Sequence, residues 1–285
     1  MYPPELIRKE ALRQDLSPRT IRTYLVCVEQ FFRKYQKNPF FINKKDIQEY
    51  LDHLLERGAP GNTINVHLNT LKFFYEQVLH KKLTVNIKYS KTAKRLPEFL
   101  TKEELISLIS GITNQKHRFM IELMYGTGMR VSELLNLKIK DFSFEQNYGW
   151  VRQGKGNKDR LFILPRKLKE SLLILIKSEH LAADDWLFNS NRHKQYSASS
   201  LREIIKEAKR RSKLNKNVHP HTLRHSFATH LIQNGYAVTE VQPLLGHSRL
   251  ETTMIYVHMA SPQLLNIKSP YDQLEMQGGN RKTSY

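Results

Sequence analysis

The chain has 285 residues, of which 40% are hydrophobic and 26% charged, a composition typical of a globular protein with one large or two ordinary domains. Its formal net charge is +19 and its pI is about 9.9. This excess of Lys and Arg favours nucleic-acid binding, because each neutralised phosphate releases a condensed counterion. We find no apolar run of the roughly 18 residues that span a bilayer and no apolar signal core near the start, so we expect a cytoplasmic protein. The single cysteine, Cys27, excludes an intramolecular disulfide.

Residues 1–87 have the sequence pattern of a helical bundle. Ser17 and Pro18 predict the start of a helix that continues to about Tyr35, because Ser caps helices well and Pro fits the first helical position. Apolar residues at helical spacing predict two further helices, over residues 44–57 and 63–80. No cluster of chemically reactive residues lies in this part of the sequence.

Residues 88–97 are expected to form a linker. The segment contains four Lys and Arg residues, no acidic residue and a proline at position 97. Such a linker either follows a phosphate backbone or is a solvated connector, and the sequence leaves both open.

Residues 98–285 are expected to form a second, mainly helical domain. Thr101 and Glu104 form a capping-box pattern, and helices are predicted at about 101–110, 117–126, 130–137, 167–180, 198–212, 222–234 and 238–245. Two short strands, 149–153 and 159–164, are joined by Gly154-Lys155-Gly156-Asn157-Lys158, which suits a tight hairpin. The predicted fold class is therefore mainly α with a small β-hairpin.

Three segments place polar residues inside otherwise apolar helices. In the first, Arg130 follows a Gly126-Thr127-Gly128 turn at a helix start, which favours an anion site, although Arg130 could equally pair with Glu133.

In the second segment, His221 and Arg224 share one helix face and could grip one phosphate. A zinc site using His221 and His225 is the competing interpretation, but an Arg stands between them and no acidic partner is near. The third segment contains His247 and Tyr256. Considered alone, His247 is an ordinary histidine at a helix end and Tyr256 an ordinary half-buried aromatic residue.

Taken together and in this order, these segments resemble the tyrosine recombinase (phage integrase) family. The resemblance rests on Arg130, His221-x-x-Arg224, Gly246-His247 and Tyr256, and on the run Gly154 to Arg160, which is similar to that family's catalytic hairpin. The runs HTLRHSFATHL, LLGHS and TTMIYVH look closest to the Xer recombinases. Residues 1–87 look like the family's core-binding domain, which would form a DNA clamp with the catalytic domain.

The resemblance implies a set of roles for these residues. Tyr256 would be the nucleophile that forms a 3′-phosphotyrosyl link, and Arg130 and Arg224 would clamp the scissile phosphate with His247 beside them. His221 would move a proton to or from Tyr256, and Lys155 would protonate the leaving 5′-oxygen. This chemistry needs no metal, ATP or other cofactor. Glu133 would help to orient Arg130.

The expected partners are double-stranded DNA recombination sites and identical chains that form a tetramer on two sites. An accessory protein is a further candidate partner, and no membrane partner is expected. The segment after Tyr256 is amphipathic and either packs on its own domain or, as the family resemblance implies and as we expect, docks on a neighbouring protomer. The expected role is chromosome or plasmid dimer resolution, with the integrase of a mobile element as the alternative. Three rival functions are a DNA-binding protein without catalysis, a type IB topoisomerase and a metal-dependent nuclease.

Overall fold

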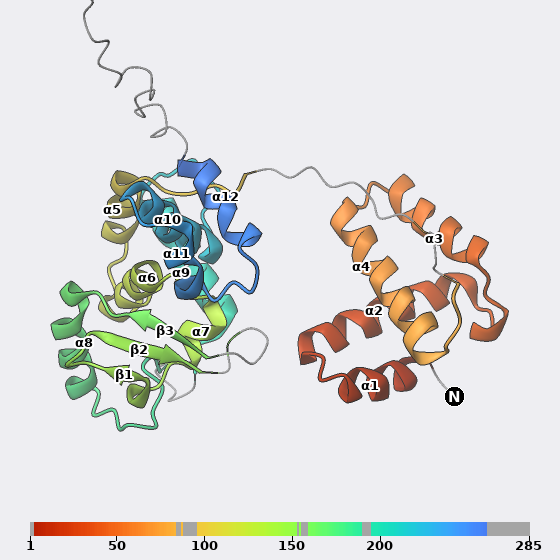
Figure 1. The fold of residues 1–285 in the computed structure, drawn as a ribbon, viewed down its shortest axis with the longest axis horizontal. Helices are drawn as coiled ribbons and strands as arrows, with labels where there is room; N and C mark the ends of the chain where they lie inside the picture. The colour runs from red at the N-terminus through yellow and green to blue at the C-terminus, as the bar shows by residue number, and fades with distance from the viewer. Residues whose placement is uncertain are drawn as a thin grey trace, which may run out of the picture. The chain divides into compact units, whose positions relative to one another are not determined.

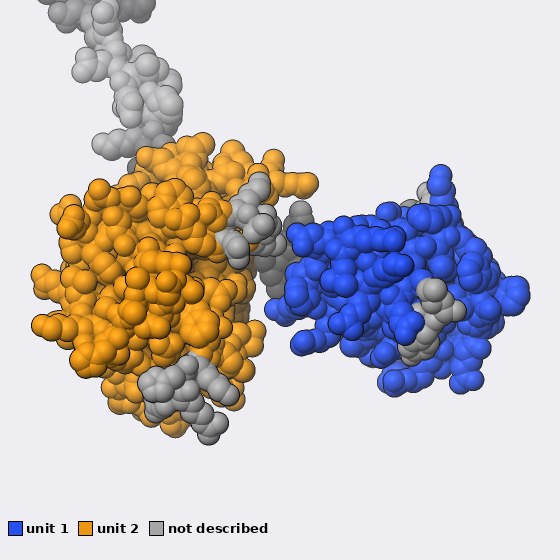
Figure 2. Space-filling model, turned by 90° about the horizontal axis from the view of Figure 1, so that it is seen from below, with its two compact units in different colours: residues 1–95 blue, residues 96–285 orange. Residues whose placement is uncertain are grey.

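The chain divides into two compact units, residues 1–95 and 96–285 (Figure 2). The computed structural model describes residues 3–83, 87, 96–152, 154, 159–189 and 195–260. Most of the expected linker, most of the hairpin loop with Lys155, and the segment after residue 260 therefore lie outside the described residues. The linker and the docking of the C-terminal segment stay predictions.

The first unit is entirely helical in its described part. Its elements are α1 (Pro3–Arg13), α2 (Pro18–Tyr35), the 3-10 turn η1 (Pro39–Phe41), α3 (Lys44–Glu56), α4 (Gly61–Lys72) and the π-helical η2 (Phe73–Val78) (Figure 1). The three helices predicted from the sequence are confirmed as α2, α3 and α4 with η2. Ser17 accepts a hydrogen bond from the backbone N–H of Thr20, as the cap prediction requires. The first helix, α1, was not predicted.

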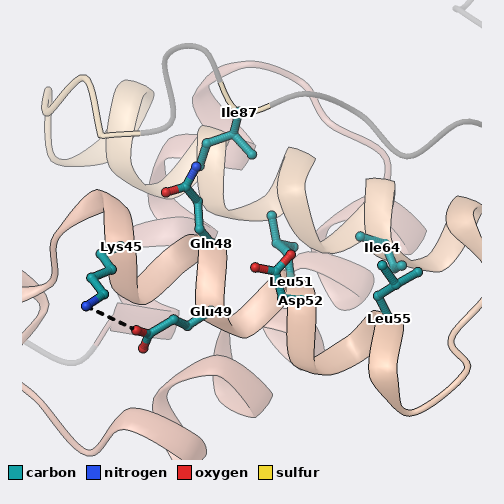
Figure 3. Close-up of a pocket in the computed structure, with 8 residues that line it drawn as sticks. All are labelled: Lys45, Gln48, Glu49, Leu51, Asp52, Leu55, Ile64 and Ile87. Atoms are coloured by element: carbon teal, nitrogen blue, oxygen red, sulfur yellow. Dashed lines mark ion pairs between the residues drawn. The ribbon is translucent and has the colours of Figure 1, made fainter.

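The core of the first unit is aromatic. Phe31 and Phe74 are fully buried, and the ring of Phe31 meets that of Tyr50 edge to face, with centroids 5.0 Å apart. Each such side chain contributes about 1.5–3 kcal/mol through burial alone. A pocket on this unit is lined mainly by α3, and its lining residues include the Lys45–Glu49 ion pair (Figure 3). None of the residues singled out for chemistry lies in it.

The second unit is mainly helical with one small sheet, which confirms the predicted fold class. Its helices are α5 (Lys102–Ser110), α6 (Gln115–Thr127), α7 (Val131–Asn136), the 3-10 turn η3 (Ile139–Asp141), α8 (Arg166–Ser178), α9 (Ala198–Arg211), α10 (Pro220–Gln233), α11 (Val238–Leu245) and α12 (Glu251–Ala260). The strands β1 (Phe142–Ser143), β2 (Tyr148–Val151) and β3 (Arg160–Ile163) form an antiparallel sheet in chain order, with Val151 opposite Arg160. Strand β1 and helix α12 were not predicted.

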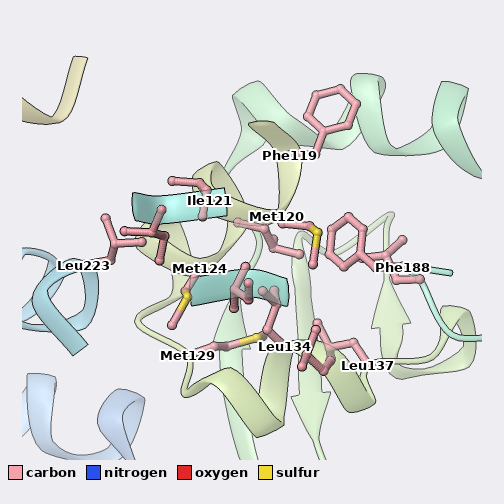
Figure 4. Close-up of a cluster of buried hydrophobic side chains, with 14 of the residues drawn as sticks. Phe119, Met120, Ile121, Met124, Met129, Leu134, Leu137, Phe188 and Leu223 are labelled. Atoms are coloured by element: carbon pink, nitrogen blue, oxygen red, sulfur yellow. The ribbon is translucent and has the colours of Figure 1, made fainter. Parts of the chain in front are cut away.

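Helix α6 lies at the centre of this unit. It contacts α5, α7, α8, α10 and β3. Its buried residues Met120 and Met124 belong to the main hydrophobic cluster with Leu134 and Leu223 (Figure 4). A smaller cluster, which includes Leu245 and Tyr256, packs α10 against α11 and α12. The segments that carry the candidate residues are thus held by two clusters, and α10 contributes buried residues to both.

Candidate active site

The turn between α6 and α7 places Arg130 and frees a backbone carbonyl for Arg224. Gly128 ends α6 with a φ of +62°, a conformation that favours glycine. A Cβ on Gly128 would lie 2.3 Å from Cδ1 of Phe227, so the close approach of α10 also requires glycine here. The Gly128 carbonyl accepts a hydrogen bond of 2.7 Å from Nη1 of Arg224.

Glu133 is a buried carboxylate that accepts hydrogen bonds from two arginines of the site and lies close to a third. Its Oε1 accepts from Nη1 of Arg130 at 2.6 Å, and its Oε2 accepts from the Arg130 backbone N–H at 2.9 Å and from Nη2 of Arg160 at 2.7 Å. Nη1 of Arg224 lies 3.9 Å from the same Oε2. The two interpretations of Arg130, as an anion site and as a partner of Glu133, are therefore both consistent with the geometry.

The charges of this cluster do not balance. Burial raises the pKa of Glu133, but Arg160, the Arg130 N–H and Arg130 itself outweigh it and hold that pKa below its usual value. Burial lowers the pKa of Arg224 to about 10, helped by Arg130, which still leaves the guanidinium charged at neutral pH. Three guanidinium groups thus share one carboxylate, and the surplus positive charge suits an anionic ligand such as a phosphate.

His247 follows α11 and contacts Arg224 directly. Its Nε2 lies 3.2 Å from Nη2 of Arg224 and its Nδ1 lies 2.9 Å from Oγ1 of Thr253. Because a guanidinium only donates, Nε2 must accept and Nδ1 carries the proton. Burial, reinforced by Arg224, lowers the pKa of His247 to about 4, so this imidazole is neutral at pH 7.

Tyr256 lies on α12, beside α10, and is only 2% exposed. Its hydroxyl is 3.2 Å from Nδ1 of His225, and its ring lies nearly parallel to that of His247, with centroids 6.3 Å apart. Burial raises the pKa of Tyr256, while Arg224 and Arg130 oppose that rise. The resting side chain is therefore a neutral phenol next to two neutral imidazoles.

The imidazole at the Tyr256 hydroxyl belongs to His225, not to His221. His221 is exposed, one helical turn earlier on α10, and its ring centroid lies 6.2 Å from that of His225. Burial lowers the pKa of His225 to about 4, so this imidazole is neutral at pH 7. The sequence pattern assigned His225 no role beyond the zinc hypothesis, although its place directly after Arg224 put it in the same segment.

Arg130 and His247 line a cavity of about 940 Å³ with Glu133, Trp150 and Arg160. Arg160 is the second residue for which the sequence pattern assigned no role, since it was noted only as part of the hairpin motif. Lys155 lies outside the described residues.

Among the described residues we find no group of three or more His, Cys, Asp or Glu side chains arranged to hold a metal ion. Nor does the described part of the chain contain a helix long and apolar enough to cross a membrane.

Comparison with known proteins finds family matches in both units of the chain. Residues 98–262 match the phage integrase family, and residues 5–85 match the phage integrase N-terminal SAM-like domain. A tyrosine recombinase of Thermosipho africanus is 35% identical over 260 residues, covering 87% of this chain and 91% of the relative. Tyrosine recombinase XerD of Staphylococcus epidermidis is 33% identical, covering 89% and 92%.

The fold is also similar to that of solved recombinases. The crystal structure of XerH site-specific recombinase bound to its difH substrate, in a pre-cleavage complex, superimposes with a TM-score of 0.71. It is 25% identical, and the match covers 93% of this chain and 82% of that one.

Proposed function

Because the chain belongs to the phage integrase family and is a site-specific tyrosine recombinase, we propose that Tyr256 is its nucleophile and that Arg130, Arg224 and His247 hold the scissile phosphate. The observation that carries this assignment is the packing of the Tyr256 ring against His247, whose Nε2 contacts the buried Arg224 guanidinium. These groups meet beside a cavity lined by Arg130 and His247.

The reaction is a phosphoryl transfer with a covalent intermediate. The Tyr256 oxygen bonds to phosphorus, the bond from phosphorus to the 5′-oxygen breaks, and a 3′-phosphotyrosyl link results. The phenol proton leaves to a neutral imidazole, and the departing 5′-oxygen takes up a proton from Lys155. The guanidinium groups of Arg130 and Arg224 stabilise the negative charge that develops on the phosphoryl oxygens. Attack by the 5′-hydroxyl of a second strand reverses these steps and restores Tyr256.

Two histidines on α10 compete for the proton transfer. His221 is the residue that the family resemblance assigns, and its exposure lets it meet DNA. His225 is in contact with the Tyr256 hydroxyl in the resting structure. We assign the proton transfer to His221 in the DNA-bound form. We assign to His225 a different role, which is to hold the Tyr256 hydroxyl before DNA binds. Because Tyr256 is buried, α12 must shift before a DNA phosphate can reach it.

The biological role we propose is Xer-like dimer resolution in the cytoplasm, by a tetramer on two DNA sites. The similarity to XerD and XerH supports this role, and the high net charge supports the binding of DNA. The two units would close around DNA as a clamp, with residues 88–97 as the linker between the domains 1–87 and 98–285. Integration of a mobile element is the alternative role. Reconstitution with the purified chain alone tests whether an accessory protein is needed.

The test is covalent trapping on nicked suicide duplexes in EDTA. Wild-type protein should form a DNA adduct on a denaturing gel, and Tyr256→Phe should bind the same DNA without forming it. Equal adduct from both proteins would overturn the assignment of Tyr256. His221→Ala and His225→Ala are then compared: we expect the first to slow cleavage of bound DNA, and the second to leave the cleavage step nearly intact.

A further inference from the structure

Arg160 joins three segments of the site that are far apart in the sequence. It is the first residue of β3 and is only 8% exposed. Its Nη2 donates to Oε2 of Glu133 at 2.7 Å, and its Nη1 donates to the carbonyl of Leu244. One guanidinium therefore ties the hairpin strand to the start of α7 and to the end of α11.

The contact between Arg160 and Leu244 lies at the C-terminal end of α11, where backbone carbonyls need hydrogen-bond donors from outside the helix. The last carbonyls of a helix have no partner within it, and α11 ends at Leu245. Arg160 supplies a donor to the Leu244 carbonyl and Arg224 supplies one to the Leu245 carbonyl. The backbone immediately before His247 is thus held by two guanidinium groups.

Gly246 brings this backbone close to Arg160. Its φ is +61°, and a Cβ at this position would lie 2.7 Å from Cδ of Arg160. The stem of Arg160 therefore packs directly against the residue that precedes His247.

Arg160 is oriented toward the protein more than toward a ligand. Both of its terminal nitrogens are engaged, and its Nε has no hydrogen-bond partner within the described part of the chain. Keeping a guanidinium buried with one donor unsatisfied is costly. A site that only needed to fill this volume would be served as well by an apolar side chain.

We propose that Arg160 is a positioning residue, which sets His247 against the Glu133–Arg130 pair so that both can engage one phosphate. This rests on the proposed function, in which Arg130 and His247 act on the scissile phosphate. It goes further than that function because it gives β3, the strand that follows the hairpin loop, a part in setting the geometry of the phosphate site.

The experiment measures single-turnover cleavage of a nicked suicide duplex by the full chain, at saturating DNA and in EDTA. Arg160→Met should slow adduct formation by about 10- to 100-fold, the range typical of losing a partner that orients a functional side chain. DNA affinity should change little. Arg118→Met is the matched control, because it also removes one positive charge, and within the described residues its side chain is paired with Glu122 alone. It should leave the rate unchanged.

A double-mutant cycle with His247→Ala separates positioning from general support of the fold. If Arg160 acts through His247, Arg160→Met should cost much less in the His247→Ala background than in the wild type. The proposal would be overturned if Arg160→Met slowed adduct formation by the same factor in both backgrounds, or if the single variant did not slow it at all. If Arg160→Met does not fold, Arg160→Lys takes its place in the cycle, because an ammonium keeps the charge without the planar fork that bridges the two acceptors.

The cycle also separates this inference from the proposed function. A failure of Tyr256→Phe to abolish the adduct would refute the assigned nucleophile. An adduct that depends on Tyr256 but not on Arg160 would refute only the positioning role.

Discussion

Replacing Glu133 by Gln removes the one carboxylate around which the arginines of the site are arranged. The side chain keeps its size, but Arg130 and Arg160 lose a charged acceptor, and Arg224 loses the nearest negative charge. The Glu133 and Arg224 side chains are each 3% exposed, so water cannot replace the lost charge. The substitution therefore tests whether the buried cluster depends on this single negative charge.

The expected loss of folding free energy is about 3–5 kcal/mol, because removing one partner leaves buried charges uncompensated. With a urea dependence of about 2 kcal/mol per M, the unfolding midpoint should fall by about 1.5–2.5 M. Glu122→Gln is the matched control. It makes the same chemical change in a surface pair with Arg118 and should cost less than about 1 kcal/mol.

Tryptophan fluorescence reports on the unit that contains Glu133. The chain has two tryptophans, and both, Trp150 and Trp186, lie in the unit 96–285. Urea titration followed by fluorescence therefore measures the unit that contains Glu133. A midpoint for Glu133→Gln no lower than that for Glu122→Gln would refute the argument from buried charge.

The same comparison has a defined pH dependence. The folded-state pKa of Glu133 is held below its ordinary value, so its ionisation contributes stability above the unfolded pKa of about 4.3. That contribution is lost as the pH falls through the folded-state pKa. Glu133→Gln lacks it, so the gap in stability between wild type and variant should narrow below about pH 4.3. A gap that is constant down to acid pH would contradict the assigned charge state.

Three further predictions concern the rest of the fold. Gly128→Ala should cost about 1–3 kcal/mol through its positive φ and its clash with Phe227, read from the fluorescence midpoint; an unchanged midpoint would contradict the packing described. Phe74→Ala should destabilise the first unit by about 3–5 kcal/mol, measured as faster reaction of the single buried thiol, Cys27, with a disulfide reagent. Burial holds the pKa of His67 below its ordinary value, so the first unit should be most stable above about pH 6.5 and lose stability as the pH falls toward the folded-state pKa. Pulse labelling of Cys27 with a reagent active in acid checks this, and protection that does not depend on pH would refute it.

Much of the fold could be predicted because its signals are local. Ser17 with Pro18, and Thr101 with Glu104, mark helix starts through groups within three residues of one another, and the structure places both caps as expected. The missed strand β1 gives a weaker local signal. Strand β1 is two residues long, and it is defined by pairing with β2 rather than by its own pattern.

The sequence alone determined the family, the fold class and the set of candidate residues, because those depend on residue types in a fixed order along the chain. Only the tertiary structure decided which groups touch. It places His225 at the Tyr256 hydroxyl, 31 residues away, and Arg160 against Glu133 and Leu244, 27 and 84 residues away. No periodicity encodes such contacts, because they arise when α10, α11, α12 and β3 pack against one another, and side chains then fill the space that this packing leaves.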